Sequence, residues 1–390
     1  MTDLSRKALN IEDLRRMAQR RLTKGLFDYI DRGSEDNVAL RNNRAALERI
    51  KLRSRVLSDT SGRHTRAELF GKPVAMPVVI GPTGPAGFVW YRAETALAKA
   101  AAKAGIPFTL ASNANTALEQ VMERGGGRQW YHLYIWRDME ASLRVVPRVE
   151  AAGFEALVLT VDSTVPYNRE TDLRSGTAFP ERPTPRMIYD LATHPRWLFG
   201  TMGRYIMAEG HLPRYPNIDM PEGLSATGVR DFMFKNDTLD WAFLKRIRDM
   251  WPRTLIVKGI LHPDDAMKCA EHGVDGVIVS NHGGIASDTA LAPIDVLPSI
   301  VHEVGDRMTV IVDSGFRRGS DILKGLALGA DAVIVGRATL YGVAAAGEAG
   351  ASRALEILQT EMRRTMGVMG LSDLKDMTRD HVVMAHELPL

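Results

Sequence analysis

The feature that most constrains the fold is a series of eight short apolar runs, each ending in a polar or glycine-containing corner. They occupy residues 77–84, 107–112, 129–135, 156–162, 255–259, 276–281, 309–315 and 332–337. Unbroken runs of this kind are typical of strands covered on both faces, as in a parallel sheet. Helical patterns separate most of them, for example at 93–105, where Gly105 is expected to end the helix. Eight such units predict an α/β fold, a (β/α)8 TIM barrel, with a doubly wound open sheet as the alternative.

Two segments lie outside this repeat. Residues 1–70 precede the first strand, and we expect them to form an N-terminal helical cap with helices at about 11–22 and 24–33, followed by an irregular approach. The connection from Asp162 to Leu255 is much longer than an ordinary connection between strands. We expect its residues 170–250 to form a lid inserted after the fourth strand. The whole chain, 1–390, is predicted to be one domain.

Within this insertion, residues 186–210 carry apolar side chains at helical spacing. They include Trp197, Leu198, Met202, Tyr205 and Ile206. Such a segment could cover the barrel mouth, or it could contact a membrane surface or another subunit.

The composition excludes several classes of protein. The chain has 50 basic and 47 acidic residues that are interspersed, so no basic stripe indicates a nucleic-acid partner. Its one cysteine, Cys269, cannot form an intramolecular disulfide; it is expected to be a small packed side chain in a reducing compartment. The first twenty residues are polar, and no apolar window is long enough to span a membrane. A cytoplasmic location is therefore expected.

Residues with catalytic chemistry gather at the strand ends. In a barrel of this kind the C-terminal ends of the strands form one mouth, where function is found. The residues at these ends are Pro82, Thr83, Gly84, Ser112, Tyr134, Thr160, Asp162, Lys258, Ser280, His282, Asp313, Gly315, Gly336 and Arg337. They supply a base, a cation, carboxylates and hydroxyl groups to one site.

The last two strand ends indicate a phosphate site. Gly315 is followed by Arg317 and Arg318, and Gly336 is followed by Arg337. Barrels commonly bind phosphate between these two loops, where glycine lets the backbone approach the anion. Glycine combined with arginine in both loops predicts that the ligand carries a phosphate group.

Three strand-end residues suggest acid–base and electrostatic catalysis. His282 could be a general base if a carboxylate orients it, and Asp162 could supply that carboxylate across the mouth. Lys258 could stabilise a developing negative charge. The alternatives are a structural histidine, a helix-capping aspartate and a lysine that extends from the sheet into solvent.

Several motifs resemble one family, the FMN-dependent 2-hydroxy acid oxidases and dehydrogenases. They are LFDYIDRGSED (26–36), LTVD (159–162) with an arginine seven positions later, SNHGG (280–284) and IVDSGFRRGSDILKGLALGADAVIVGR (311–337). Residues 319–350, with IGPTG and THPRW, are most similar to the (S)-mandelate dehydrogenases. The resemblance covers residues 10–380 and includes glycolate oxidase and L-lactate dehydrogenase.

The resemblance implies FMN at the barrel mouth, no metal, and a role for each matching residue. His282 would be the base, Asp162 its partner and Lys258 the cation beside the reduced flavin. Tyr29, Tyr134 and Arg169 would contact the substrate hydroxyl and carboxylate. Flavin, ribityl and phosphate contacts would come from Pro82, Thr83, Gly84, Ser112, His132, Thr160, Lys258, Ser280, Asp313, Gly315, Arg317, Gly336 and Arg337. A homotetramer is expected, and the electron acceptor could be oxygen, a quinone or a protein.

The chain departs from the family pattern at several positions. The family motif His-Gly-Gly-Arg ends here in Ile285, so the arginine that helps bind the substrate carboxylate is missing. Ala286-Ser287-Asp288 replaces a usual Gln-Leu-Asp, His132 replaces a glutamine and Ala111 replaces a serine. Three hypotheses follow. Arg169 alone anchors a mandelate-like 2-hydroxy acid; or the substrate is an ester, an amine or a larger intermediate; or the chain binds FMN without catalysis.

Overall fold

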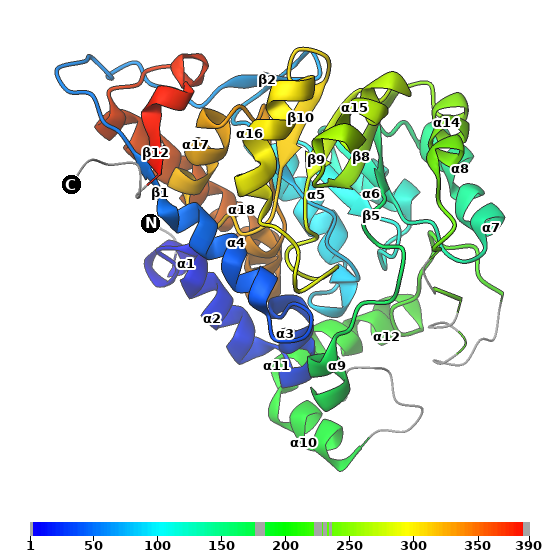
Figure 1. Ribbon diagram of the computed structural model, residues 1–390. Helices are drawn as coiled ribbons and strands as arrows, with labels where there is room; N and C mark the ends of the chain where they lie inside the picture. The colour runs from blue at the N-terminus through cyan, green and yellow to red at the C-terminus, as the bar shows by residue number, and fades with distance from the viewer. Residues whose placement is uncertain (1–2, 176–183, 222–227, 229–231, 234–235, 385–390) are drawn as a thin grey trace.

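A closed barrel of eight parallel strands forms the centre of the computed structural model, which describes residues 3–175, 184–221, 228, 232–233 and 236–384 (Figure 1). The strands are β4 (Val78–Ile80), β5 (Phe108–Ala111), β6 (Gln129–Leu133), β7 (Ala156–Thr160), β8 (Thr254–Ile260), β9 (Gly276–Val279), β10 (Thr309–Val312) and β11 (Ala332–Val335). Seven of the predicted runs contain one strand each, and β8 extends one residue beyond its run at both ends. β11 pairs with β4, so the sheet closes. The predicted (β/α)8 TIM barrel is confirmed, and the open sheet is excluded.

The barrel is filled by alternate side chains of its strands. In β4, Val79 belongs to the cluster inside the barrel, whereas Val78 and Ile80 pack toward the surrounding helices. This alternation follows from the two-residue period of a strand. The hairpin of β2 (Ala67–Leu69) and β3 (Lys72–Val74) adds side chains to the inner cluster, and the Phe70 ring meets Trp130 edge-on at 5.7 Å.

Helices surround the barrel and follow the strands in sequence. They are η1 (Ala86–Phe88), α5 (Ala93–Ala104), α6 (Leu118–Gly125), α7 (Met139–Leu143), α8 (Val145–Ala152), α14 (Trp241–Met250), α15 (Pro263–Glu271), α16 (Pro293–Val304), α17 (Gly319–Ala327) and α18 (Arg337–Met369). Gly105 ends α5 in the left-handed conformation, with a φ of 66°, as the sequence predicted. Non-helical residues at Ala346 and Gly347 break α18 into two parts. Cys269 of α15 is buried, as expected, and burial raises the pKa of its thiol to about 12.

The N-terminal segment contains α1 (Asp3–Lys7), α2 (Ile11–Arg21), α3 (Lys24–Asp31) and α4 (Val38–Arg49). The predicted helices at 11–22 and 24–33 correspond to α2 and α3. The irregular approach expected after them was partly wrong, because α4 follows and packs against α16. Strand β1 (Ile50–Leu52) then pairs with β12 (Val382–Met384), which follows the short helices η3 (Leu374–Asp376) and η4 (Arg379–His381). The segment that follows the N-terminal helices therefore lies beside the C-terminal strand (Figure 1).

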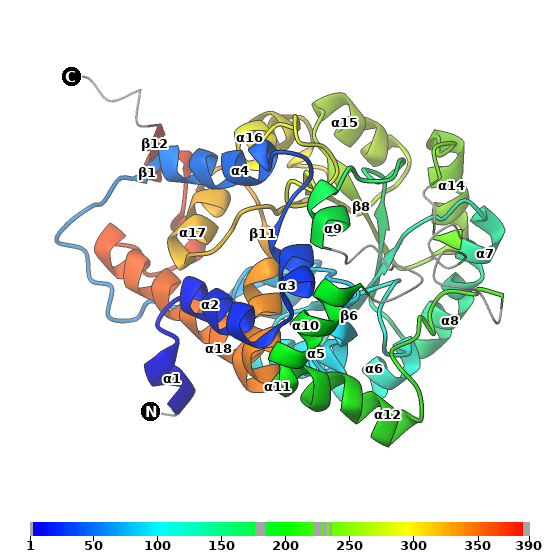
Figure 2. The same ribbon diagram turned by 90° about the horizontal axis from the view of Figure 1, so that it is seen from below.

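The long insertion after β7 forms α9 (Glu170–Ser175), α10 (Pro185–Thr193), α11 (Pro195–Trp197), η2 (Leu198–Gly203) and α12 (Arg204–Glu209). Both views place α9 beside α3 (Figures 1 and 2). Trp197 fixes the insertion to the barrel, since its indole N–H donates to the Phe88 carbonyl at 2.7 Å. Parts of the predicted lid, 176–183, 222–227, 229–231 and 234–235, lie outside the described residues. Among the residues described, no helix has both the length and the hydropathy to cross a bilayer.

Candidate active site

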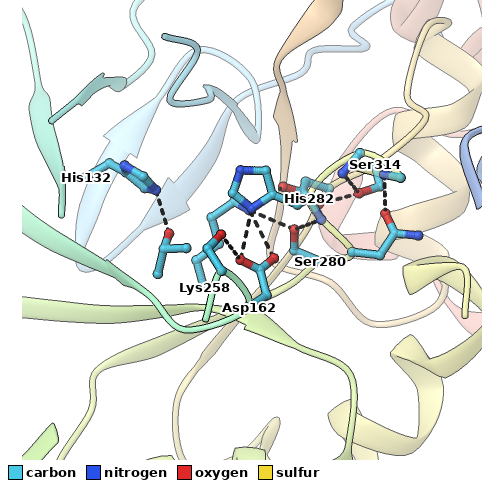
Figure 3. A network of polar contacts seen from close by, with 12 residues as sticks. His132, Asp162, Lys258, Ser280, His282 and Ser314 are labelled. Atoms are coloured by element: carbon cyan, nitrogen blue, oxygen red, sulfur yellow. Dashed lines mark hydrogen bonds and ion pairs between the residues drawn. The ribbon is translucent and has the colours of Figure 1, made fainter. Parts of the chain in front are cut away.

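A histidine–carboxylate pair stands at the C-terminal ends of β7 and β9. The His282 Nδ1 lies 2.9 Å from Asp162 Oδ1, and the two side chains are only 15% and 9% exposed (Figure 3). His282 adopts a φ of 58°, in the left-handed region that non-glycine residues seldom enter. The Ser280 hydroxyl supports this turn by accepting the His282 backbone N–H at 3.0 Å. The imidazole is therefore largely enclosed.

Lys258 places a buried cation beneath this pair. Its side chain, at the end of β8, is 4% exposed. The ammonium donates to the Ser280 hydroxyl at 2.8 Å and lies 3.9 Å from Asp162 and 3.6 Å from Asp313. Burial alone would raise the pKa of the Asp162 carboxyl, but the charges of His282 and Lys258 lower it well below its usual range. Asp162 is therefore a carboxylate at neutral pH. Because Lys258 is buried, the alternative that it extends from the sheet into solvent is wrong.

Two tyrosines and an arginine lie on the other side of His282. The Tyr134 hydroxyl is 2.8 Å from His282 Nε2, and burial raises its pKa well above the usual value. The Arg169 guanidinium lies 4.6 Å from the centre of the Tyr29 ring. Arg169 also forms an ion pair with Asp172 at 2.8 Å, where both side chains are mostly buried. The positive charge of Arg169 is therefore compensated by Asp172 within the protein.

A cavity of about 890 Å³ opens in front of these residues, within the size range of small-molecule and cofactor sites. Fourteen of the predicted site residues border it: Tyr29, Pro82, Thr83, Gly84, His132, Tyr134, Arg169, Lys258, His282, Asp313, Gly315, Arg317, Gly336 and Arg337. Arg318 does not, because it turns away and pairs with Glu361 at 3.1 Å.

The remaining four predicted residues support the cavity wall from behind. Ser112 accepts the Tyr134 backbone N–H at 3.2 Å, Thr160 hydrogen-bonds the His132 imidazole, Ser280 binds Lys258, and Asp162 binds His282. Figure 3 shows His132 across the site from the His282 group. These residues hold the side chains that border the cavity.

The N-terminal segment anchors the loop that carries His282. The Ser34 N–H donates to the Gly284 carbonyl at 3.1 Å, and Asp288 accepts the N–H groups of Asp36 and Ala39, both at 3.0 Å. The aspartate that ends the altered Ala286-Ser287-Asp288 motif therefore binds α4 to this loop.

Sequence reasoning missed several residues of the site, and two of them lie against His282 or its loop. Tyr167 borders the cavity, and its ring centre lies 5.6 Å from that of His282. Ser314 accepts the Gly283 N–H at 3.0 Å and donates to Asp313 at 2.7 Å (Figure 3). Ser314 lies inside the quoted motif 311–337, and Tyr167 lies between the predicted residues Asp162 and Arg169. Their position in the same loops as predicted site residues is the signal that could have identified them.

The profile of the FMN-dependent dehydrogenase family matches residues 18–384. The chain belongs to this family. It is 38% identical over 381 residues to (S)-mandelate dehydrogenase of Pseudomonas putida, covering 97% of this chain and 95% of that protein. It is 39% identical over 382 residues to a putative L-lactate dehydrogenase of Mycobacterium tuberculosis, covering 98% and 90%. The family resemblance read from the sequence is confirmed, and the chain is an FMN-dependent alpha-hydroxy-acid oxidoreductase.

Solved structures of the family share the fold. The crystal structure of monotopic membrane protein (S)-mandelate dehydrogenase superposes with a TM-score of 0.91 at 37% identity, covering 97% of this chain and 99% of that one. A mandelate oxidase variant with 2-hydroxy-phenylacetamide gives 0.76 at 32% identity, covering 94% and 96%.

The cavity has the chemistry that FMN requires. Thr83 contributes a buried hydroxyl oxygen that has no hydrogen-bond partner among the described residues. A Cβ added to Gly336 would meet only the Thr83 methyl group, at 3.5 Å, so this glycine leaves room beside the wall. Arg317 and Arg337 border the same part of the cavity, and burial lowers the pKa of Arg337 to about 10, which still leaves it charged at neutral pH. The Thr83 hydroxyl, the uncrowded backbone at Gly336 and the two arginines together suit a phosphate-bearing ring system.

Proposed function

We propose that this protein oxidises an aromatic or otherwise bulky 2-hydroxy acid to the 2-oxo acid, with His282 as the base. The observation that carries the proposal is the contact of His282 with Asp162 at the cavity wall, above the buried ammonium of Lys258. Asp162 would keep the imidazole proton on Nδ1, so Nε2, which lies 2.8 Å from the Tyr134 hydroxyl, would carry the lone pair that takes the substrate proton.

Each neighbouring group would have a defined part in this reaction. Asp162 would stabilise the imidazolium that forms when His282 takes the substrate proton. The bound FMN would accept the two electrons and the second proton that the substrate loses, and Lys258 would lower the cost of negative charge on that side of the cavity. Tyr29 and Tyr134 would orient the substrate by hydrogen bonds. Residues Thr83, Arg317, Gly336 and Arg337 would hold the cofactor.

The cavity wall supports a bulky apolar substituent on the substrate. Its apolar and aromatic members include Leu26, Trp136, Leu173, Met187, Leu191, Trp197, Tyr215, Met233 and Ile285. Several come from the insertion, which is consistent with the predicted lid. The mandelate substrates named for two of the similar proteins carry an aromatic ring of this kind.

A second candidate is a neutral substrate, such as the amide or ester of a 2-hydroxy acid, and one observation favours it. Arg169, the arginine expected to bind the carboxylate, is already paired with Asp172, and Ile285 offers no charge. A carboxylate would therefore meet no uncompensated cation from these two positions. The mandelate oxidase variant with 2-hydroxy-phenylacetamide shows that a related protein accommodates an amide. Amines fall in the same class.

Anaerobic mixing distinguishes these candidates. The purified protein is combined with FMN, and bleaching of the flavin is followed after addition of 2-hydroxy acids, their amides and esters, and amines. Fast bleaching by (S)-mandelate or bulkier acids supports the first candidate, whereas bleaching only by amides, esters or amines supports the second. Binding of FMN with no bleaching by any compound would contradict both and favour a non-catalytic role.

We also propose peripheral contact with the inner face of a membrane through residues 186–210, from a cytoplasmic location. The similar (S)-mandelate dehydrogenase structure is described as monotopic. Large apolar side chains are exposed along this stretch and just beyond it: Ile188, Tyr189, Phe199, Ile206, Met207 and Leu212. An apolar face of this kind suits the interface between headgroups and acyl chains. We further propose that the protein is a homotetramer. Its electron acceptor would be oxygen, a quinone or a protein.

A further inference from the structure

Ser163 and Tyr167, which have no part in the proposed function, connect His282 to Asp162 by a second route. The Tyr167 hydroxyl hydrogen-bonds the Ser163 hydroxyl, and the Tyr134 and Tyr167 hydroxyls are also hydrogen-bonded to each other. The Ser163 hydroxyl lies 3.2 Å from Asp162 Oδ1. All of these side chains belong to the wall of the cavity or lie directly behind it.

These contacts close a ring. From His282 Nε2 the path runs to the Tyr134 hydroxyl at 2.8 Å, to the Tyr167 hydroxyl, to the Ser163 hydroxyl and to Asp162 Oδ1 at 3.2 Å. Asp162 Oδ1 returns to His282 Nδ1 at 2.9 Å. The imidazole is therefore connected to its carboxylate twice, once directly and once through three hydroxyl groups.

The number of protons in this ring depends on the charge of His282. When the imidazole is neutral, Nδ1 donates to Asp162 and Nε2 must accept from Tyr134. The three hydroxyl protons can then point only toward His282, and Ser163 has none left for Asp162. When the imidazole is protonated, Nε2 donates to Tyr134, every hydroxyl proton can reverse, and Ser163 donates to Asp162. The protonated ring thus completes one more hydrogen bond than the neutral ring.

We propose that Tyr167 and Ser163 are positioning residues that raise the basicity of His282, by forming a hydroxyl path that is complete only when the imidazole carries a proton. This inference depends on the proposed role of His282 as the base. The hydroxyl path would stabilise the state that exists after the substrate proton has moved to Nε2, which is where acid–base catalysis gains.

The other charged groups near His282 act on it without the hydroxyl path. Asp162 contacts it directly, and Lys258, beside Asp313, lies 3.9 Å from Asp162. Arg337 donates to the backbone carbonyl of Gly283, the next residue along the loop. None of these contacts passes through Tyr167, so removing its hydroxyl leaves them in place.

The test replaces single hydroxyl groups in the FMN-bound protein. Tyr167→Phe keeps the ring and removes the hydroxyl, Ser163→Ala interrupts the path at its far end, and Ser163→Thr restores a hydroxyl there. Tyr189→Phe is the matched control, because Tyr189 is exposed on α10. The pKa of His282 is read by NMR of ¹⁵N-labelled histidine, with His282→Gln identifying its signal. The pH dependence of kcat/KM is measured in parallel.

Tyr167→Phe should lower the pKa of His282 by about one unit, a tenfold change in its proton affinity. The acid limb of kcat/KM should move to lower pH by the same amount, and kcat should fall about tenfold at high pH. Ser163→Ala should shift both in the same direction, and Ser163→Thr and Tyr189→Phe should match the original protein. An unchanged pKa of His282 in folded Tyr167→Phe, whatever its activity, would overturn the inference. If His282→Gln keeps full flavin reduction, the proposed function fails instead, and the NMR titration still decides whether the path acts on the imidazole.

Discussion

Position 285 is the departure from the family motif that bears most directly on the binding of a substrate carboxylate. Ile285 borders the cavity in the loop that carries His282, at the position where the resemblance to the motif His-Gly-Gly-Arg implies an arginine. Arg169, the other arginine expected to bind the substrate carboxylate, is 11% exposed and forms an ion pair with Asp172. A charge-assisted hydrogen bond to a carboxylate is worth about 1.5–3 kcal/mol, and an isoleucine supplies none of it. The substrate preference should therefore depend strongly on this residue.

Ile285→Arg should raise kcat/KM for (S)-mandelate relative to mandelamide by one to two decades, since it restores a cation for the carboxylate. Stopped-flow flavin reduction with both compounds measures the ratio. Ile285→Leu, which changes shape without adding charge, is the control and should leave the ratio near its original value. A ratio that does not rise in the arginine variant would show that the carboxylate does not lie near this position.

At the scale of elements, α2 and α3 are joined by an ion pair that also reaches α18. Asp31 accepts from Arg15 at 2.6 and 2.7 Å and from the Tyr341 hydroxyl at 2.7 Å. Burial would raise the pKa of Asp31, but the hydrogen bonds from Arg15 and Tyr341 lower it below the usual value. This contact holds the N-terminal helices, including Tyr29, against the barrel.

Asp31→Asn should cost about 2 kcal/mol of unfolding free energy at pH 7, because Arg15 loses its charged partner. The folded pKa of Asp31 is lowered, so its contribution is complete above the unfolded pKa of about 3.9 and disappears as pH falls through the folded value. Urea titrations at neutral and acidic pH measure this difference, with exposed Asp306→Asn as control. Equal destabilisation by Asp31→Asn at both pH values would contradict the account.

The loop that carries His282 is fitted to α4 by a glycine. Gly284 has a φ of 75°, and a Cβ at this position would lie 2.5 Å from the Leu40 backbone nitrogen. Neither the backbone conformation nor the space admits a larger residue.

Gly284→Ala should lower stability by about 2 kcal/mol or more and slow flavin reduction by displacing His282. Gly62→Ala is the matched control, because a Cβ there meets nothing within 4 Å. Thermal unfolding and anaerobic flavin reduction measure both effects. A Gly284→Ala protein with the Tm and rate of the Gly62→Ala protein would show that the loop adapts.

The elements show which parts of the structure the sequence could predict. The strands were predictable because unbroken apolar runs such as 332–335 need burial on both faces, and parallel strands bring their ends together. α4 was not, because its sequence VALRNNRAALER mixes apolar residues with three arginines, two asparagines and a glutamate, and the helix is stabilised by tertiary contacts. Residue spacing does not specify loop conformations. It therefore could not predict the ion pair of Arg169 with Asp172, the pairing of Arg318 with Glu361 away from the cavity, or the hydrogen-bonded ring through Tyr167.

At the scale of the whole molecule, the apolar face around α10, η2 and α12 lies on the same insertion that borders the cavity (Figures 1 and 2). Phe199 is 70% and Met207 79% exposed. If this face rests on a lipid surface, the cavity lies close to the bilayer, where a quinone acceptor would be available.

Phe199→Asp with Met207→Asp should abolish flotation of the protein with vesicles of mixed neutral and anionic phospholipids, because charged groups oppose insertion at the interface. Val368→Asp is the control, since Val368 is 68% exposed on α18, outside the insertion. Flavin reduction in solution should be unchanged in all variants. If the original protein stays with the soluble fraction, or the double variant floats as well as the control, the membrane contact fails.

The whole arrangement of cap, barrel and insertion places the His282 imidazole, paired with Asp162, at the cavity wall, and replacing it is the most direct test. His282→Ala should still bind FMN, because Thr83, Arg317 and Arg337 are untouched, but its anaerobic flavin reduction by the best substrate should fall at least a hundredfold. Reduction at the original rate in a folded, FMN-loaded His282→Ala protein would contradict the account.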